Sequence, residues 1–121
     1  MDKTEKHGLE KERENQFKAD PILRDFLSEI APVREAIRKI ILFGSRARGT
    51  HTPDSDYDLL LVVDRRDPLL VDRLYDAVMD VLLKHGRLIS LKFFTPAEMD
   101  RLARLKTPFM QHVLREGVGV G

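Results

Sequence analysis

The stretch LFGSRARGTHTPDSDYDLLLVVD, residues 42–64, decides the fold of this 121-residue chain. It begins at the end of one apolar run, passes through Gly44, Ser45 and a polar loop, and ends in a second apolar run that follows Asp56 and Asp58. Short apolar runs bounded by turn residues are typical of buried strands. The stretch therefore predicts two strands joined by a glycine–serine turn and a loop, with two carboxylates where the second strand begins.

The two aspartates are predicted to point the same way. Residues i and i+2 of a strand project from one face, so Asp56 and Asp58 would lie together, with Tyr57 opposite. Two ionised carboxylates this close repel each other unless a cation lies between them. Mg²⁺ commonly takes one or two carboxylates and completes its shell with water and substrate phosphates. The plainer alternatives are a solvated acidic strand start and ion pairs with Arg46 and Arg48.

The turn before the aspartates has the residues of a phosphate site. Gly44 permits a positive φ and a close approach of ligand to backbone, and Ser45 offers a hydroxyl and a backbone N–H. A helix beginning here would add the free N–H groups of its first turn. Arg46 and Arg48 would either bring positive charge to phosphates or lie in solvent. Taken alone, a Gly-Ser pair is also an ordinary tight turn.

Composition limits the class of protein. With 42% apolar and 34% charged residues, the chain fits one globular domain. A net charge of +1 gives no general attraction to nucleic acid or to membranes. The absence of cysteine excludes disulfides and cysteine-ligated metal. No apolar run reaches the length of a membrane span, and the first residues lack a signal-peptide core, so a cytoplasmic location is expected.

The rest of the chain is predicted to alternate strands and helices. Strands are expected at residues 39–43, 56–63 and 88–94, and helices where proline follows a capping residue, at 20–21, 67–68, 95–96 and 107–108. The predicted fold class is α/β (α+β), a small mixed sheet of three to four strands with helices mainly on one face. Residues 1–19 form a charged arm, read as a frayed helix or a disordered segment, and residues 20–121 form a single domain.

Gly44-Ser45, ten intervening residues and Asp56-x-Asp58, placed between two apolar strands, resemble the signature of the DNA polymerase beta-type nucleotidyltransferase superfamily. The segments LFGSRARG and SDYDLLLVV resemble its minimal nucleotidyltransferase branch, as do LISLKFFTPAEM and TPFMQHVLREGV. The resemblance extends over residues 37–118. It implies a nucleotidyltransferase-like fold and transfer of a nucleoside monophosphate, AMP in the first place, from ATP or another NTP to a hydroxyl.

The resemblance also implies roles for the quoted residues. Gly44 and Ser45 would hold the β- and γ-phosphates, and Asp56 and Asp58 would hold Mg²⁺, with Mn²⁺ as the other candidate ion. In this branch the acceptor is often a protein side chain, and many members are antitoxins encoded beside a HEPN-type RNase toxin. A protein partner is therefore expected, in a homo- or hetero-oligomer, with no membrane and no strong sign of direct nucleic-acid binding.

The third predicted strand departs from the family pattern. Active members usually carry a third carboxylate there, which helps hold metal near the attacking hydroxyl and serves as a base. Residues 87–94 read RLISLKFF and contain no acid. Ser90 is the expected equivalent, and Lys92 would share its face, so both are assigned to the cofactor side of the site. The plainer interpretation of both is an exposed strand edge.

Three functions therefore stay open. The first is an enzyme that nucleotidylates a partner protein. The second is a nucleotide-binding module that has lost turnover with the third carboxylate and acts by contact with its partner. The third is the catalytic half of a small-molecule or RNA nucleotidyltransferase whose acceptor-binding domain is another chain.

Overall fold

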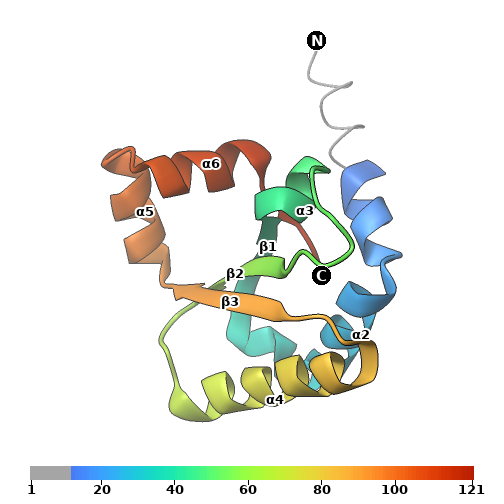
Figure 1. Cartoon of the computed structure of the whole chain (residues 1–121). Helices are drawn as coiled ribbons and strands as arrows, with labels where there is room; N and C mark the ends of the chain where they lie inside the picture. The colour runs from blue at the N-terminus through green and yellow to red at the C-terminus, as the bar shows by residue number, and fades with distance from the viewer. Residues whose placement is uncertain (1–11) are drawn as a thin grey trace.

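In the computed structural model, which describes residues 12–121, four strands form one mixed sheet in the order β3-β2-β1-β4. Figure 1 labels β1, β2 and β3 of this sheet. The strands are β1 (Ile37–Phe43), β2 (Tyr57–Val63), β3 (Ile89–Phe94) and β4 (Val118–Gly119). β1 is antiparallel to both of its neighbours, and β2 is parallel to β3. The mixed sheet confirms the predicted fold class, and β2 occupies the central position expected of it.

Local capping chemistry sets where the longer helices begin. The helices are α2 (Pro21–Glu29), the 3₁₀ helix η1 (Ala31–Ala36), α3 (Gly44–Arg48), α4 (Pro68–His85), α5 (Pro96–Arg104) and α6 (Pro108–Glu116). Asp20, Asp67, Thr95 and Thr107 each cap a helix whose first residue is proline. A side-chain oxygen at the N-cap accepts from the free backbone N–H groups, and proline is pre-set for the first turn. All four predicted helix starts are therefore correct.

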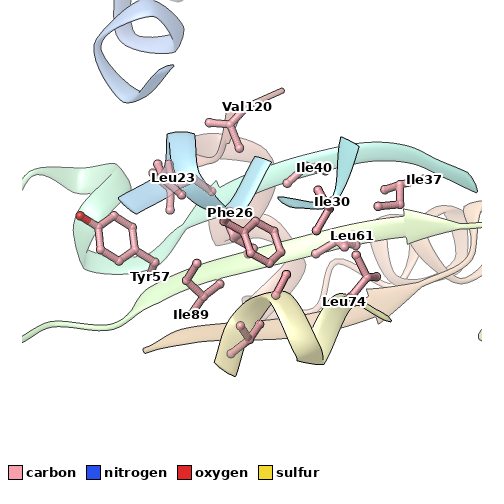
Figure 2. Close-up of a cluster of buried hydrophobic side chains, with 14 of the residues drawn as sticks. Leu23, Phe26, Ile30, Ile37, Ile40, Tyr57, Leu61, Leu74, Ile89 and Val120 are labelled. Atoms are coloured by element: carbon pink, nitrogen blue, oxygen red, sulfur yellow. The ribbon is translucent and has the colours of Figure 1, made fainter. Parts of the chain in front are cut away.

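The sheet is buried on both faces. On one face, alternate residues of β2 pack with α2 and α4 in the main core, where Phe26 lies among side chains such as Leu61 and Leu74 (Figure 2). On the other face, Leu60 and Val62 pack in a smaller cluster with residues of α5 and α6. The larger core lies on one face, but α5 and α6 cover the opposite face as well (Figure 1).

The apolar residues of α5 and α6 mostly belong to this second cluster. Met110 and Val113 are buried, and Met99, Leu102 and Phe109 pack against them. Leu114, in contrast, is 61% exposed.

Residues 12–18 are helical, while residues 1–11 of the charged arm lie outside the described residues. The Arg13 guanidinium donates to the Ala47 carbonyl over 2.7 Å, and Phe17 packs against the main core. Of the two interpretations of the arm, the helix therefore applies to this part. Within residues 12–121, none of the helices combines the length and apolar content needed to cross a bilayer.

Glu29, at the end of α2, lacks a hydrogen-bond partner for Oε2 within the described residues. Burial raises the pKa of its carboxyl, and the charges of Asp80 and Asp25 raise it further. A raised folded-state pKa means that ionising Glu29 at neutral pH destabilises the fold.

We predict that Glu29→Gln raises the thermal unfolding midpoint at pH 7, because it removes an unfavourable, partly buried charge. The gain should shrink as the pH falls through the folded-state pKa, since wild-type Glu29 is then protonated too. Thermal unfolding from pH 4 to 8 measures this, with the exposed Glu35→Gln as control. An unchanged or lower midpoint at pH 7 would contradict the prediction.

Candidate functional site

The turn that follows β1 lies beside the start of β2. β1 ends at Phe43, which pairs with Asp58 across the antiparallel ladder. Gly44 follows with φ of 76° and begins the short helix α3. A positive φ is costly for residues with a Cβ, so the backbone here requires the glycine that the sequence supplies.

The carboxylate of Asp58 lies directly against that turn. A Cβ added to Gly44 would sit 2.5 Å from Asp58 Oδ2, well inside van der Waals contact. Gly49, at the other end of α3, also has a positive φ of 78°, but nothing lies within 4 Å of its added Cβ. Of these two glycines, only Gly44 makes room for a carboxylate side chain.

Asp56 and Asp58 act on each other electrostatically. The strand was predicted to begin at Asp56, but β2 begins at Tyr57, so Asp56 lies just before the strand. Asp56 is exposed, whereas Asp58 is partly buried. Burial raises the pKa of the Asp58 carboxyl, and the Asp56 charge raises it further, while the Lys92 and Arg48 charges lower it. Two carboxylates and two cationic side chains are therefore gathered at this end of the sheet.

β3 brings Ser90 to the position opposite Asp58. The parallel register pairs Asp58 with Ser90 and Leu60 with Lys92, so both polar residues of β3 share the Asp58 face by strand alternation. The Lys92 ammonium lies 6.0 Å from the centroid of the Phe109 ring. The expected register of Ser90 and Lys92 is thus correct, and no carboxylate of β3 joins the aspartates.

Arg46 is placed differently from each interpretation of the sequence, which gave it a phosphate contact, a place in solvent or an ion pair with the aspartates. It is only 9% exposed, and its guanidinium donates to the Ser55 carbonyl over 3.0 Å and to the Pro53 carbonyl over 3.2 Å. The group also stacks at 4.0 Å on the Tyr57 ring. Because Tyr57 points to the face opposite the aspartates, Arg46 holds the loop and is not directed at a phosphate beside Asp58.

Arg48 is the arginine of the turn that borders the site. It is exposed, and it forms a 3.2 Å ion pair with Glu116 of α6. A pocket of about 290 Å³ opens beside it, lined by Phe43, Gly44, Arg48, Phe109, His112, Val113 and Glu116. Ser45 is partly exposed in the first turn of α3.

The donor set fits one hard divalent ion. Within residues 12–121, no group of three or more histidine, aspartate or glutamate side chains is arranged so that it could hold a metal ion. The pair Asp56 and Asp58 would supply two oxygen ligands, and Mg²⁺ takes the remainder from water and phosphates.

A family model for the nucleotidyltransferase domain matches residues 21–112. This chain belongs to that family. It is 33% identical over 96 residues to a candidate protein adenylyltransferase of Methanocaldococcus jannaschii, covering 78% of this chain and 90% of the relative.

Two solved structures resemble parts of this chain. A chain from a toxin–antitoxin complex with AMP-PNP superposes with a TM-score of 0.50 at 16% identity, covering 80% of this chain and 70% of the other. A candidate nucleotidyltransferase of Sulfolobus solfataricus gives a TM-score of 0.47 at 18% identity, covering 91% and 84%. The first likeness supports the fold.

In this nucleotidyltransferase domain, Tyr57 and Asp20 are joined by a hydrogen bond that the sequence pattern did not reveal. The Tyr57 hydroxyl donates to Asp20 Oδ2 over 2.7 Å. Burial, followed by this hydrogen bond, raises the pKa of Tyr57 to about 12, so its hydroxyl stays protonated. The sequence identified Asp20 as a helix cap. A cap uses one carboxylate oxygen, so the second oxygen of Asp20 was free to accept a hydrogen bond from another side chain.

We predict that Gly44→Ala destabilises the domain more than Gly49→Ala does. Both variants place a Cβ at positive φ, which costs about 1–2 kcal/mol, but only Gly44→Ala also overlaps the Asp58 carboxylate, at a further cost of about 1–3 kcal/mol. Chemical denaturation of the two variants isolates the contact. Equal losses of unfolding free energy would show that Asp58 does not depend on this glycine.

Proposed function

We propose that this domain transfers a nucleoside monophosphate, AMP in the first instance, from an NTP to a hydroxyl of a partner protein. The observation that carries the proposal is the Asp58 carboxylate seated on the backbone of Gly44, with Asp56 beside it. Anionic ligands for a metal and a turn suited to phosphate thus share one location. The cationic Arg48 and Lys92 next to them favour a polyphosphate.

Each residue would have a distinct task. Gly44 and Ser45 would hold the β- and γ-phosphates through backbone N–H groups and the serine hydroxyl. Asp56 and Asp58 would hold Mg²⁺ or Mn²⁺, which when bound supplies charge neutralisation at the transferring phosphate. Lys92 and Arg48 would add fixed positive charge, so positioning and electrostatics would account for most of the rate.

The reaction exchanges one bond to phosphorus for another. The acceptor oxygen forms a bond to the α-phosphorus, and the bond from that phosphorus to the oxygen bridging the β-phosphorus breaks. Pyrophosphate leaves, and the hydroxyl proton passes to solvent. The turn at Gly44 and Ser45 would hold the pyrophosphate portion while the acceptor approaches from the opposite side, as an in-line displacement requires.

A protein acceptor is supported by the relatives. The Methanocaldococcus jannaschii relative is described as a protein adenylyltransferase, and the fold neighbour with AMP-PNP comes from a toxin–antitoxin complex. Together with the resemblance to the minimal branch, this favours an antitoxin that modifies a HEPN-type toxin. Labelled ATP incubated with this protein and the neighbouring gene's product should label that product. Label appearing only on free small molecules would refute a protein acceptor.

The second candidate function is a nucleotide-binding partner module with little turnover. The observation that favours it is Ser90 opposite Asp58, where a carboxylate would help hold metal and serve as base. Both functions require nucleotide binding, and they differ in the rate of transfer.

We predict that Asp56→Asn combined with Asp58→Asn abolishes metal-dependent ATP binding and leaves the fold intact. Wild-type protein should bind Mg²⁺ weakly alone and more tightly with ATP, because the phosphates complete the shell. Titration calorimetry measures both. The matched control is Asp64→Asn, an exposed aspartate beyond the other end of β2 that pairs with Arg38. ATP binding that persists in the double variant would place the site elsewhere.

We predict that Ser90→Asp raises the rate of nucleotidyl transfer while ATP affinity changes little. A general base contributes on the order of a hundred- to ten-thousand-fold, and its gain acts on the transition state and so appears in kcat. Ser90→Asn, of similar shape without charge, is the control. If wild-type protein already transfers rapidly and Ser90→Asp changes nothing, another carboxylate completes the site.

A further inference from the structure

The loop that carries Asp56 is held on both sides of that residue. On one side, the Arg46 guanidinium gathers the carbonyls of Ser55, Pro53 and Thr52, at 3.0, 3.2 and 3.4 Å. On the other side, Tyr57 is 3% exposed, begins β2, and donates its backbone N–H to the Leu88 carbonyl. Asp56 lies between these two fixed neighbours with its own side chain in solvent.

Arg46 connects the two sides of the loop. Its guanidinium carbon lies over the Tyr57 ring, 4.0 Å from the ring centroid, while its N–H groups donate to the loop carbonyls. The Tyr57 hydroxyl is in turn held by Asp20, whose other oxygen caps α2. A planar fork of donors suits several acceptors and an aromatic face at once, which the point charge of lysine does not.

We propose that Arg46 is a positioning residue that acts through Asp56: it fixes the loop so that the Asp56 carboxylate lies beside Asp58 for binding a divalent cation. The inference rests on the metal site proposed above. Arg46 stands on the opposite side of the chain from the carboxylates and would touch neither metal nor nucleotide. Its effect would pass through the backbone from Ser55 to Asp56.

The expected loss of metal affinity on removing Arg46 can be taken from other groups that orient metal ligands. Removing a group that orients a metal ligand typically lowers metal affinity 10- to 100-fold. If Arg46 stabilised only the fold, removing it would lower the stability of the protein and leave the metal affinity of each folded molecule unchanged. The two roles therefore separate in a binding measurement made on folded protein.

The test is a double-mutant cycle read out by Mn²⁺ affinity, measured by titration calorimetry with an ATP analogue whose α,β-bridge is methylene. Arg46→Met should weaken Mn²⁺ binding 10- to 100-fold relative to wild type. In an Asp56→Asn background, the same change should cost little further, because the ligand that Arg46 positions is already gone. Arg46→Lys, which keeps the charge, should recover part of the loss, and its own cycle decides the matter if Arg46→Met does not fold.

Arg34→Met is the matched control, since Arg34 also donates to backbone carbonyls, those of Gly121 and Ile37, away from the aspartates. It should lower stability without changing Mn²⁺ affinity. Hydrogen exchange of metal-free protein adds a second readout: amides of residues 52–56 should exchange faster in Arg46→Met and not in Arg34→Met.

Equal losses in both Asp56 backgrounds, or no loss with Asp56 present, would overturn the inference. Wild-type protein that binds no Mn²⁺ with the analogue would overturn it together with the metal site. Wild-type protein that binds Mn²⁺ in the predicted cycle but transfers no nucleotide would refute the proposed enzymatic function alone and support this inference.

Discussion

The close approach of the Asp58 carboxylate to the Gly44 backbone links the sheet, the turn and the candidate site. It requires the end of β1 and the start of β2 to lie side by side, and the antiparallel pairing of Phe43 with Asp58 provides this. It also requires a residue without a Cβ at a positive φ, which only glycine adopts at little cost. The sheet, the turn and the carboxylate therefore constrain one another, and a phosphate and a metal could meet only where all three conditions hold.

Much of the fold was predictable because its rules are local. Asp20-Pro21 and Thr107-Pro108 place a capping oxygen and a preformed first turn next to each other in the sequence, so the helix starts follow directly. The apolar run after Asp58 is long enough to mark a central strand. β4, in contrast, has two residues and exists through its pairing with Ile41 and Leu42 of β1, which no local pattern records.

The residues of the candidate site also fall into those that a local sequence pattern predicts and those that it does not. The side of Ser90 and Lys92 followed from strand alternation, and the register of β3 agrees with it. The position of Arg46 could not be predicted from strand alternation, because an arginine in a polar turn is usually solvated. Here its burial depends on Tyr57 and on carbonyls of the following loop. The same sequence pattern, GSRARG, thus contains one arginine that borders the carboxylates and one that supports the loop from behind.

The electrostatics of the pair explain why such a site needs support from elsewhere in the fold. Because the folded-state pKa of Asp58 is raised, its ionised form opposes folding at neutral pH. The repulsion would also drive the Asp56 side of the loop away from β2 if nothing held it. The hydrogen bonds from the Arg46 guanidinium to the loop carbonyls are suited to resist this, because they hold the backbone without placing the cation between the two carboxylates. A brace of that kind, on the far side of the chain, leaves the negative charge uncompensated and available to an incoming metal–nucleotide complex, and binding then returns stability to the fold.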